Sequence, residues 1–131
     1  MWLVVGLGNP GKQYEGNRHN VGFRVVDRLA ERWKAGVLKD KFQGRFAKAS
    51  FAGTECVLLE PLTFMNLSGD SVRRAMDFFK IPVERVIVVH DEMDLPFGEL
   101  RVKVGGGAAG HNGLRSITNH ATAEFVRVRV G

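Results

Sequence analysis

Short apolar runs alternate with polar, glycine-containing segments along the whole chain. Between Val21 and Gly36 the apolar residues recur every three or four positions, which predicts an amphipathic helix that ends near Gly36. The same spacing predicts a second helix over 68–80 and a short third helix that begins near Asn112. The chain therefore contains helices long enough to cover a sheet.

Between these helices lie segments with the pattern of strands. The predicted strands cover residues 2–5, 46–52, 55–60, 85–89, 99–104 and 125–130. Residues 46–52 and 55–60 form a hairpin that turns at Gly53, whereas 85–89 is almost entirely apolar, as expected of a central strand covered on both faces. Strands interleaved with helices predict one α/β domain over 1–131, with a mixed, largely parallel sheet and helices on both faces.

Composition narrows the class of protein without identifying it. A chain of 131 residues fits one compact domain, and 44% hydrophobic with 25% charged residues is typical of soluble proteins. No apolar run approaches the roughly 20 residues that cross a bilayer, and the first residues do not resemble a signal peptide, so we expect a cytoplasmic protein. The lone Cys56 lies among apolar residues and is expected to be a small buried side chain. The net charge of +5 suits a polyanionic partner, but it is also common on small soluble proteins.

Four polar segments follow predicted strands: 6–20, 62–66, 90–94 and 105–112. In open α/β sheets, ligands bind beyond the carboxyl ends of the strands. We therefore expect these four segments to converge on one site.

The first of these segments matches the glycine pattern of dinucleotide-binding folds over Gly6–Gly11. That mechanism needs a helix to open within the motif and an acidic residue at the end of the next strand. Here Pro10 and the polar run after it delay the helix, and Asp27 lies inside that helix. The glycines are better explained as a tight loop that presents Asn9.

His19 is the candidate general base. It lies at the end of the first polar segment, directly before a helix, and histidine can accept a proton from water near neutral pH. Asp91, at the end of the apolar strand, is the best placed acid to orient the imidazole. The simpler alternatives are a helix cap for His19 and an ordinary polar strand end for Asp91.

Two other kinds of chemistry fit the spacing less well. Potential zinc ligands are His19, His90, Asp91, Glu92, Asp94 and His111. No two of the histidines stand three to five residues apart, and no H-E-x-x-H motif occurs, so no metal is expected. Ser68 is not part of a G-x-S-x-G nucleophile elbow.

Each of three asparagines lies in one of the converging segments: Asn9, Asn66 and Asn112. Amide side chains donate and accept hydrogen bonds and can hold a peptide backbone, although asparagine is also common in turns.

Several motifs together resemble those of a known family. They are VGLGNPG over 5–11, Tyr14, RHNVG over 18–22, Pro61, TFMNLSG over 63–69, HDEMDLP over 90–96 and GHNGL over 110–114. In this set and order, the chain closely resembles the bacterial peptidyl-tRNA hydrolases.

The resemblance implies hydrolysis of the ester bond between peptide and tRNA, which recycles tRNA from prematurely released peptidyl-tRNA. It implies that His19 is the base, that Asp91 orients it, and that the three asparagines position the peptidyl ester. It further implies that the cleft is lined by Tyr14, Met65 and His111. Neither a cofactor nor a membrane is expected, and we expect a monomer. The alternative is a non-catalytic RNA-binding protein on the same fold, which an intact His19 and Asp91 disfavour.

The chain departs from the family pattern in two places. Ala108 and Ala109 stand where the family usually has glycine. The family's sequence also continues beyond the segment that resembles 125–131, so we expect a C-terminally incomplete domain with part of its apolar sheet surface bare.

Arg101 and Lys103 are candidate tRNA-binding residues. A spacing of two on a strand places both on one face, beside the glycine-rich loop. A merely solvated strand face is the alternative.

Overall fold

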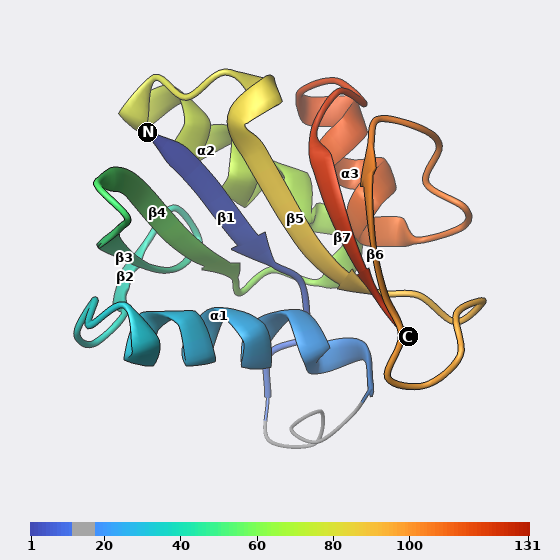
Figure 1. Cartoon of the computed structure of the whole chain (residues 1–131). Helices are drawn as coiled ribbons and strands as arrows, with labels where there is room; N and C mark the ends of the chain where they lie inside the picture. The colour runs from blue at the N-terminus through green and yellow to red at the C-terminus, as the bar shows by residue number, and fades with distance from the viewer. Residues whose placement is uncertain (12–17) are drawn as a thin grey trace.

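The computed structural model describes residues 1–11 and 18–131. In this part of the chain one sheet is formed by β1 (Trp2–Gly6), β2 (Lys39–Lys41), β3 (Gly44–Phe51), β4 (Thr54–Pro61), β5 (Val86–Asp91), β6 (Leu100–Val104) and β7 (Val126–Val130). The α-helices are α1 (Val21–Arg32), α2 (Ser68–Phe79) and α3 (Asn112–His120), and short 3₁₀ helices cover Arg18–Asn20, Met65–Leu67 and Val83–Arg85. Every predicted strand and helix is present (Figure 1).

The strand order across the sheet is β2-β3-β4-β1-β5-β7-β6. The four central strands β4, β1, β5 and β7 pair in parallel, whereas β2, β3 and β6 are antiparallel to their neighbours. The expected mixed α/β sheet is therefore confirmed. Strand β2 was not predicted, because its three residues are all charged and exposed and show no apolar alternation.

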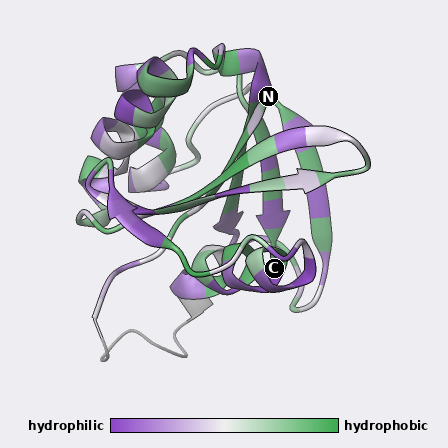
Figure 2. Ribbon diagram, turned by 90° about the vertical axis from the view of Figure 1, so that its left-hand side faces the viewer, coloured by the Kyte–Doolittle hydropathy of each residue, from purple (hydrophilic) through white to green (hydrophobic). Residues whose placement is uncertain are grey.

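Helices cover both faces of the sheet, as expected (Figure 1). Leu3 and Val5 of β1 pack in the core that includes α2 and α3, and Val4 between them packs in the core that includes α1. This alternation follows from the strand geometry, since successive side chains point to opposite faces. The helices carry both hydrophilic and hydrophobic positions, as amphipathic helices on a sheet should (Figure 2).

Two glycines bring the first helix onto the end of β1. A Cβ atom on Gly6 would lie 2.1 Å from the carbonyl oxygen of Gly22, and one on Gly22 would lie 2.3 Å from the backbone nitrogen of Leu7. Only glycine permits so close an approach of the two backbones. The start of α1, and His19 just before it, are thereby fixed against the end of the strand.

Helix α1 ends at Arg32, one turn before the predicted end near Gly36. The pattern of apolar residues continues to Trp33, but Lys34 has a left-handed φ of 54°, which ends a helix.

One strip of the sheet is exposed. Leu100, Val102 and Val104 of β6 are 59%, 63% and 68% exposed. They pair with the valines of β7 and so share the face that α1 covers further along the sheet. The expected bare apolar surface is therefore present. The lone Cys56 is buried, as its apolar neighbours predicted.

Candidate functional site

A cavity of about 380 Å³ opens at the carboxyl ends of β1 and β5. Its walls come from all four predicted segments and consist of Asn9, His19, Met65, Asp91, Glu92, Met93, Asp94, Ala109, Gly110, His111 and Asn112. The expected convergence of these segments is confirmed.

The segment 105–112 reaches the cavity for a different reason from the segments 6–20, 62–66 and 90–94. Strand β6 runs antiparallel to β7, and Val104 at its end pairs with Val126, far from the end of β5 at Asp91. Residues 105–110 must therefore run back along the sheet before α3 begins (Figure 1). It is the N-terminus of α3, and not the end of a strand, that places His111 at the site.

A buried arginine holds this glycine-rich connection. Arg127 is only 2% exposed, and its guanidinium donates hydrogen bonds to the carbonyl oxygens of Gly106 and Gly107 at 2.6 and 2.5 Å. It also donates to the carbonyl of Ala123 and lies over the ring of Phe125. The sequence offered no sign of this role, since the acceptors are backbone carbonyls some twenty residues away.

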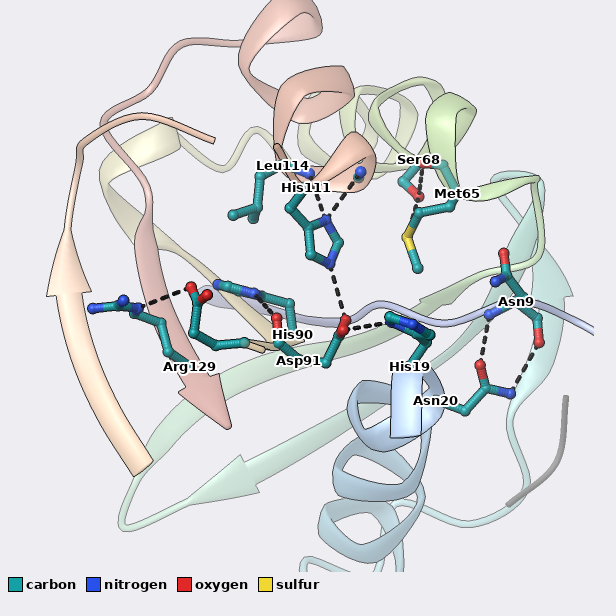
Figure 3. A network of polar contacts seen from close by, with 12 residues as sticks. Asn9, His19, Asn20, Met65, Ser68, His90, Asp91, His111, Leu114 and Arg129 are labelled. Atoms are coloured by element: carbon teal, nitrogen blue, oxygen red, sulfur yellow. Dashed lines mark hydrogen bonds and ion pairs between the residues drawn. The ribbon is translucent and has the colours of Figure 1, made fainter. Parts of the chain in front are cut away.

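His19 and Asp91 are in direct contact, as Figure 3 shows. Nδ1 of His19 lies 2.5 Å from Oδ2 of Asp91. Half of the His19 side chain is exposed, whereas Asp91 is 4% exposed. Because a carboxylate only accepts, the proton of this bond sits on Nδ1, which gives Nε2 of a neutral imidazole the basic lone pair.

Asp91 also contacts His111, whose Nε2 lies 3.1 Å from Oδ1. Burial alone raises the pKa of the Asp91 carboxyl group. The hydrogen bond and charge of His111, and after them the charge and hydrogen bond of His19, outweigh the effect of burial, so this pKa lies below its usual value. The carboxyl group is therefore ionised at neutral pH. A buried anion held between two histidines can orient a base.

The loop that carries Asn9 is fixed by Asn20. The backbone nitrogen of Asn9 donates to Oδ1 of Asn20 at 2.8 Å, and Nδ2 of Asn20 donates back to the carbonyl of Asn9 at 3.0 Å (Figure 3). Asn20 is buried, so its amide is used internally. Sequence reasoning missed this anchor, although an asparagine directly before a helix was a visible signal.

The other predicted residues are not all in one place. Met65 and Asn112 line the cavity with His19, but Asn66 lines an adjacent cavity of about 420 Å³, which Met65 and Asn112 also border. Tyr14 lies outside the described residues. Among the residues that line the main cavity, Met93 is a further exposed apolar side chain that sequence reasoning did not single out.

Arg101 and Lys103 lie on the exposed strand β6 and are not among the residues that line the cavity. Arg101 pairs with Glu99, its Nη2 lying 2.8 Å from a carboxylate oxygen. In register they stand opposite Arg129 and Arg127 of β7, which places all four side chains on the same face of the sheet.

None of the helices in the described part of the chain is long and apolar enough to cross a membrane. Within residues 1–11 and 18–131, no group of three or more His, Cys, Asp or Glu side chains is arranged to hold a metal ion.

Comparison with known proteins gives a consistent result. The family model described as "Peptidyl-tRNA hydrolase" matches residues 3–131. The chain is 58% identical to a peptidyl-tRNA hydrolase of Sorangium cellulosum and 49% identical to one of Bacillus thuringiensis, with the whole chain covered in both. It spans 59% of the length of the first protein and 71% of the second.

Solved structures agree with this result. The crystal structure of peptidyl-tRNA hydrolase from Acinetobacter baumannii superposes with a TM-score of 0.95 at 42% identity, covering all of this chain and 68% of that one. At this identity the similarity extends beyond the fold. The chain belongs to the peptidyl-tRNA hydrolase family.

Proposed function

We propose that this chain hydrolyses the ester bond between the peptide and the tRNA of peptidyl-tRNA, with water activated by His19 and Asp91. The observation that carries the proposal is the contact of 2.5 Å between Nδ1 of His19 and Oδ2 of Asp91, in a cavity that water can reach. The names of the relatives support the same substrate.

In the proposed reaction, Nε2 of His19 takes a proton from water while the water oxygen attacks the ester carbonyl. Asp91 keeps the proton of the neutral imidazole on Nδ1 and stabilises the imidazolium that forms. When the tetrahedral intermediate collapses, the C–O bond breaks, and the imidazolium returns its proton to the departing 3′ oxygen of the tRNA. The products are a peptide carboxylic acid, which releases its proton to solvent to become a carboxylate, and a tRNA with a free hydroxyl group.

The asparagines are proposed to hold the peptide part of the substrate. Asn9 and Asn112 line the same cavity as His19, and Asn66 borders the adjacent cavity, which shares Met65 and Asn112 with the first. A neighbouring amide N–H is proposed to stabilise the oxyanion.

The proposed chemistry uses water and side chains of a single chain, so it requires neither a metal ion nor a cofactor, and a monomer suffices. Because the substrate is a product of translation, we propose that the reaction takes place in the cytoplasm.

The test is hydrolysis of a defined peptidyl-tRNA by this chain, by His19→Ala and by the control His120→Ala, which removes an exposed histidine at the end of α3. We expect His19→Ala to lower turnover by at least about 10², because general-base assistance contributes about 10²–10⁴, with tRNA affinity nearly unchanged. His120→Ala should behave like the parent. Near-normal turnover by His19→Ala would exclude His19 as the base, and tRNA binding without hydrolysis by the parent would favour the RNA-binding alternative.

A further inference from the structure

His111 makes contacts on both sides of its ring. Its Nδ1 accepts hydrogen bonds from the backbone nitrogens of Gly113 and Leu114, at 3.1 and 3.3 Å. These N–H groups belong to the first turn of α3, where no carbonyl of the helix is available to accept them. His111 is therefore the N-cap of α3, a position that more commonly holds a serine, threonine, aspartate or asparagine.

The cap determines where the imidazole carries its proton. Backbone N–H groups can only donate, so Nδ1 must offer its lone pair, and the proton of the neutral ring must be on Nε2. Nε2 in turn lies 3.1 Å from Oδ1 of Asp91 (Figure 3). The N–H bond of His111 thus points at the carboxylate.

The two oxygens of Asp91 are divided between two histidines, His111 at Oδ1 and His19 at Oδ2. Since His19 must give its Nδ1 proton to this bond, the two rings carry their protons on opposite nitrogens. Without the donor at Oδ1, the carboxylate can turn about its own bond and present either oxygen, or neither, to His19.

We infer that His111 is a positioning residue. The N-terminus of α3 fixes its ring, the ring holds the carboxylate of Asp91 in one orientation, and the carboxylate keeps the proton of His19 on Nδ1. This inference deepens the proposed function and rests on it. It differs from the role implied by the family resemblance, in which His111 only lines the cleft; the ring does border the cavity, but it is 14% exposed.

His90 supports the same arrangement from behind. It is fully buried, and its ring meets that of His111 at a centroid distance of 5.0 Å and an angle of 72°. Nδ1 of His90 lies 2.7 Å from the carbonyl oxygen of Asp91. Burial lowers the pKa of His90, against the opposing effect of this hydrogen bond, so the ring is neutral and donates from Nδ1. His90 therefore restrains both the ring plane of His111 and the backbone of Asp91.

Two substitutions separate the two contacts of His111. His111→Asn keeps a good N-cap, because the amide oxygen of asparagine accepts from the first turn of a helix, but the shorter side chain does not reach Asp91. His111→Gln is long enough to direct an amide N–H at Asp91, but glutamine is not among the residues that cap helices well. The first variant loses the contact with the carboxylate, and the second loses the cap.

The first measurement is ¹⁵N NMR of the histidine side chains in the parent chain, which needs no substrate. We expect His111 to carry its proton on Nε2 and His19 to carry its proton on Nδ1. In His111→Asn we expect the Nδ1-protonated fraction of His19 to fall, and in His111→Gln we expect it to be retained. These results stand or fall independently of whether the chain hydrolyses peptidyl-tRNA.

The second measurement is steady-state hydrolysis. We expect His111→Asn to lower kcat by about tenfold or more, as a small misplacement of a catalytic group does, with KM within about twofold of the parent. His111→Gln should recover most of kcat while its unfolding temperature falls. A raised KM with unchanged kcat and unchanged His19 tautomer in His111→Asn would show that His111 contacts the substrate instead. A proton on Nδ1 of His111 in the parent would overturn the inference even if the asparagine variant did not fold.

Discussion

Nδ1 of His19 and Oδ2 of Asp91 lie 2.5 Å apart, although 72 positions separate the two residues in the chain. Their approach depends on the parallel pairing of β1 with β5, in which Gly6 stands opposite Val89. His19 follows the first of these strands, after a connection that Asn20 ties to Asn9, and Asp91 ends the second. The register of two central strands thus sets the distance on which the proposed catalysis depends.

Asp91→Asn tests this contact. An asparagine can donate to His19 where the carboxylate could only accept, which favours the tautomer with the proton on Nε2 and removes the base. We expect kcat to fall, though less than in His19→Ala, with tRNA affinity preserved. Single-turnover hydrolysis over a range of pH measures the effect. An unchanged rate with an unchanged pH profile would exclude the pair.

Removal of charge at Arg101 and Lys103 tests the prediction from the sequence that these two residues bind tRNA. The double substitution to glutamine should weaken tRNA binding and reduce the slope of log K against log salt by up to about 0.7–0.9 per lost phosphate contact. The control is glutamine at Arg32 and Lys34, which lie at the other end of α1 from the site. If both double variants show the same salt dependence of tRNA binding as the parent, Arg101 and Lys103 belong to a solvated strand face.

Glu60 predicts a pH dependence of stability. The side chain is fully buried on β4. Burial has the largest effect on its pKa, followed by the hydrogen bond and charge of Asp27, and together they raise this pKa to about 8 against the opposing effect of Arg45. The folded state therefore holds this proton more tightly than the unfolded state. The contribution of the protonated Glu60 to the free energy of unfolding is complete below the pKa that this group has in the unfolded chain. It is lost as the pH rises towards 8, by up to about 1.4 kcal/mol per pH unit.

We expect Glu60→Gln to flatten this dependence and to be more stable than the parent above pH 8. Urea unfolding at several pH values between 5 and 9 measures it. The matched control is Glu55→Gln, at an exposed position of the same strand. Parallel stability curves for the parent and Glu60→Gln would show that Glu60 is already ionised in the folded chain.

Arg127→Met tests the anchor of the glycine-rich connection. Methionine fills a similar space but removes the guanidinium donor from the carbonyls of Gly106 and Gly107, and a hydrogen bond from a charged group contributes about 1.5–3 kcal/mol. We expect a lower unfolding temperature and faster hydrogen exchange at residues 105–111. The comparison is Arg129→Met on the same strand, whose side chain pairs with Glu92. Equal exchange rates in the two variants would mean that Arg127 does not hold the connection.

The exposed apolar side chains of β6 are expected to bind apolar dyes and to promote self-association. Threonine at Leu100, Val102 and Val104 retains the preference for a strand and removes apolar surface. We expect less binding of a fluorescent apolar dye and less self-association at high concentration, with little change in unfolding temperature. A clear loss of stability in the triple variant would show instead that these side chains contribute to the core.

Most of the fold was predictable because the apolar periodicity of every element except β2 is strong. The convergence of Asn9, His19 and Asp91 was also predictable, since parallel strands end at one edge of the sheet. The direction of β6 was not, because alternation along a strand carries no information about which way it pairs. Nor was the burial of Arg127, whose partners are carbonyl oxygens that any sequence possesses. Asn66 was placed correctly in its segment, but a one-dimensional pattern does not distinguish two adjacent cavities.

The central place of β1 has a consequence for synthesis of the chain. Its partners are β4, which starts at residue 54, and β5, which starts at residue 86. A ribosome adds about 5–20 residues per second, so Leu3 and Val5 wait roughly 4–17 s for the second of these neighbours. During that interval the apolar strand β1 has been synthesised but lacks at least one of the two strands that pair with it in the sheet. The growing polypeptide is most exposed to aggregation then, and substitutions that slow the docking of β5 should lower the yield of folded protein more than they lower its final stability.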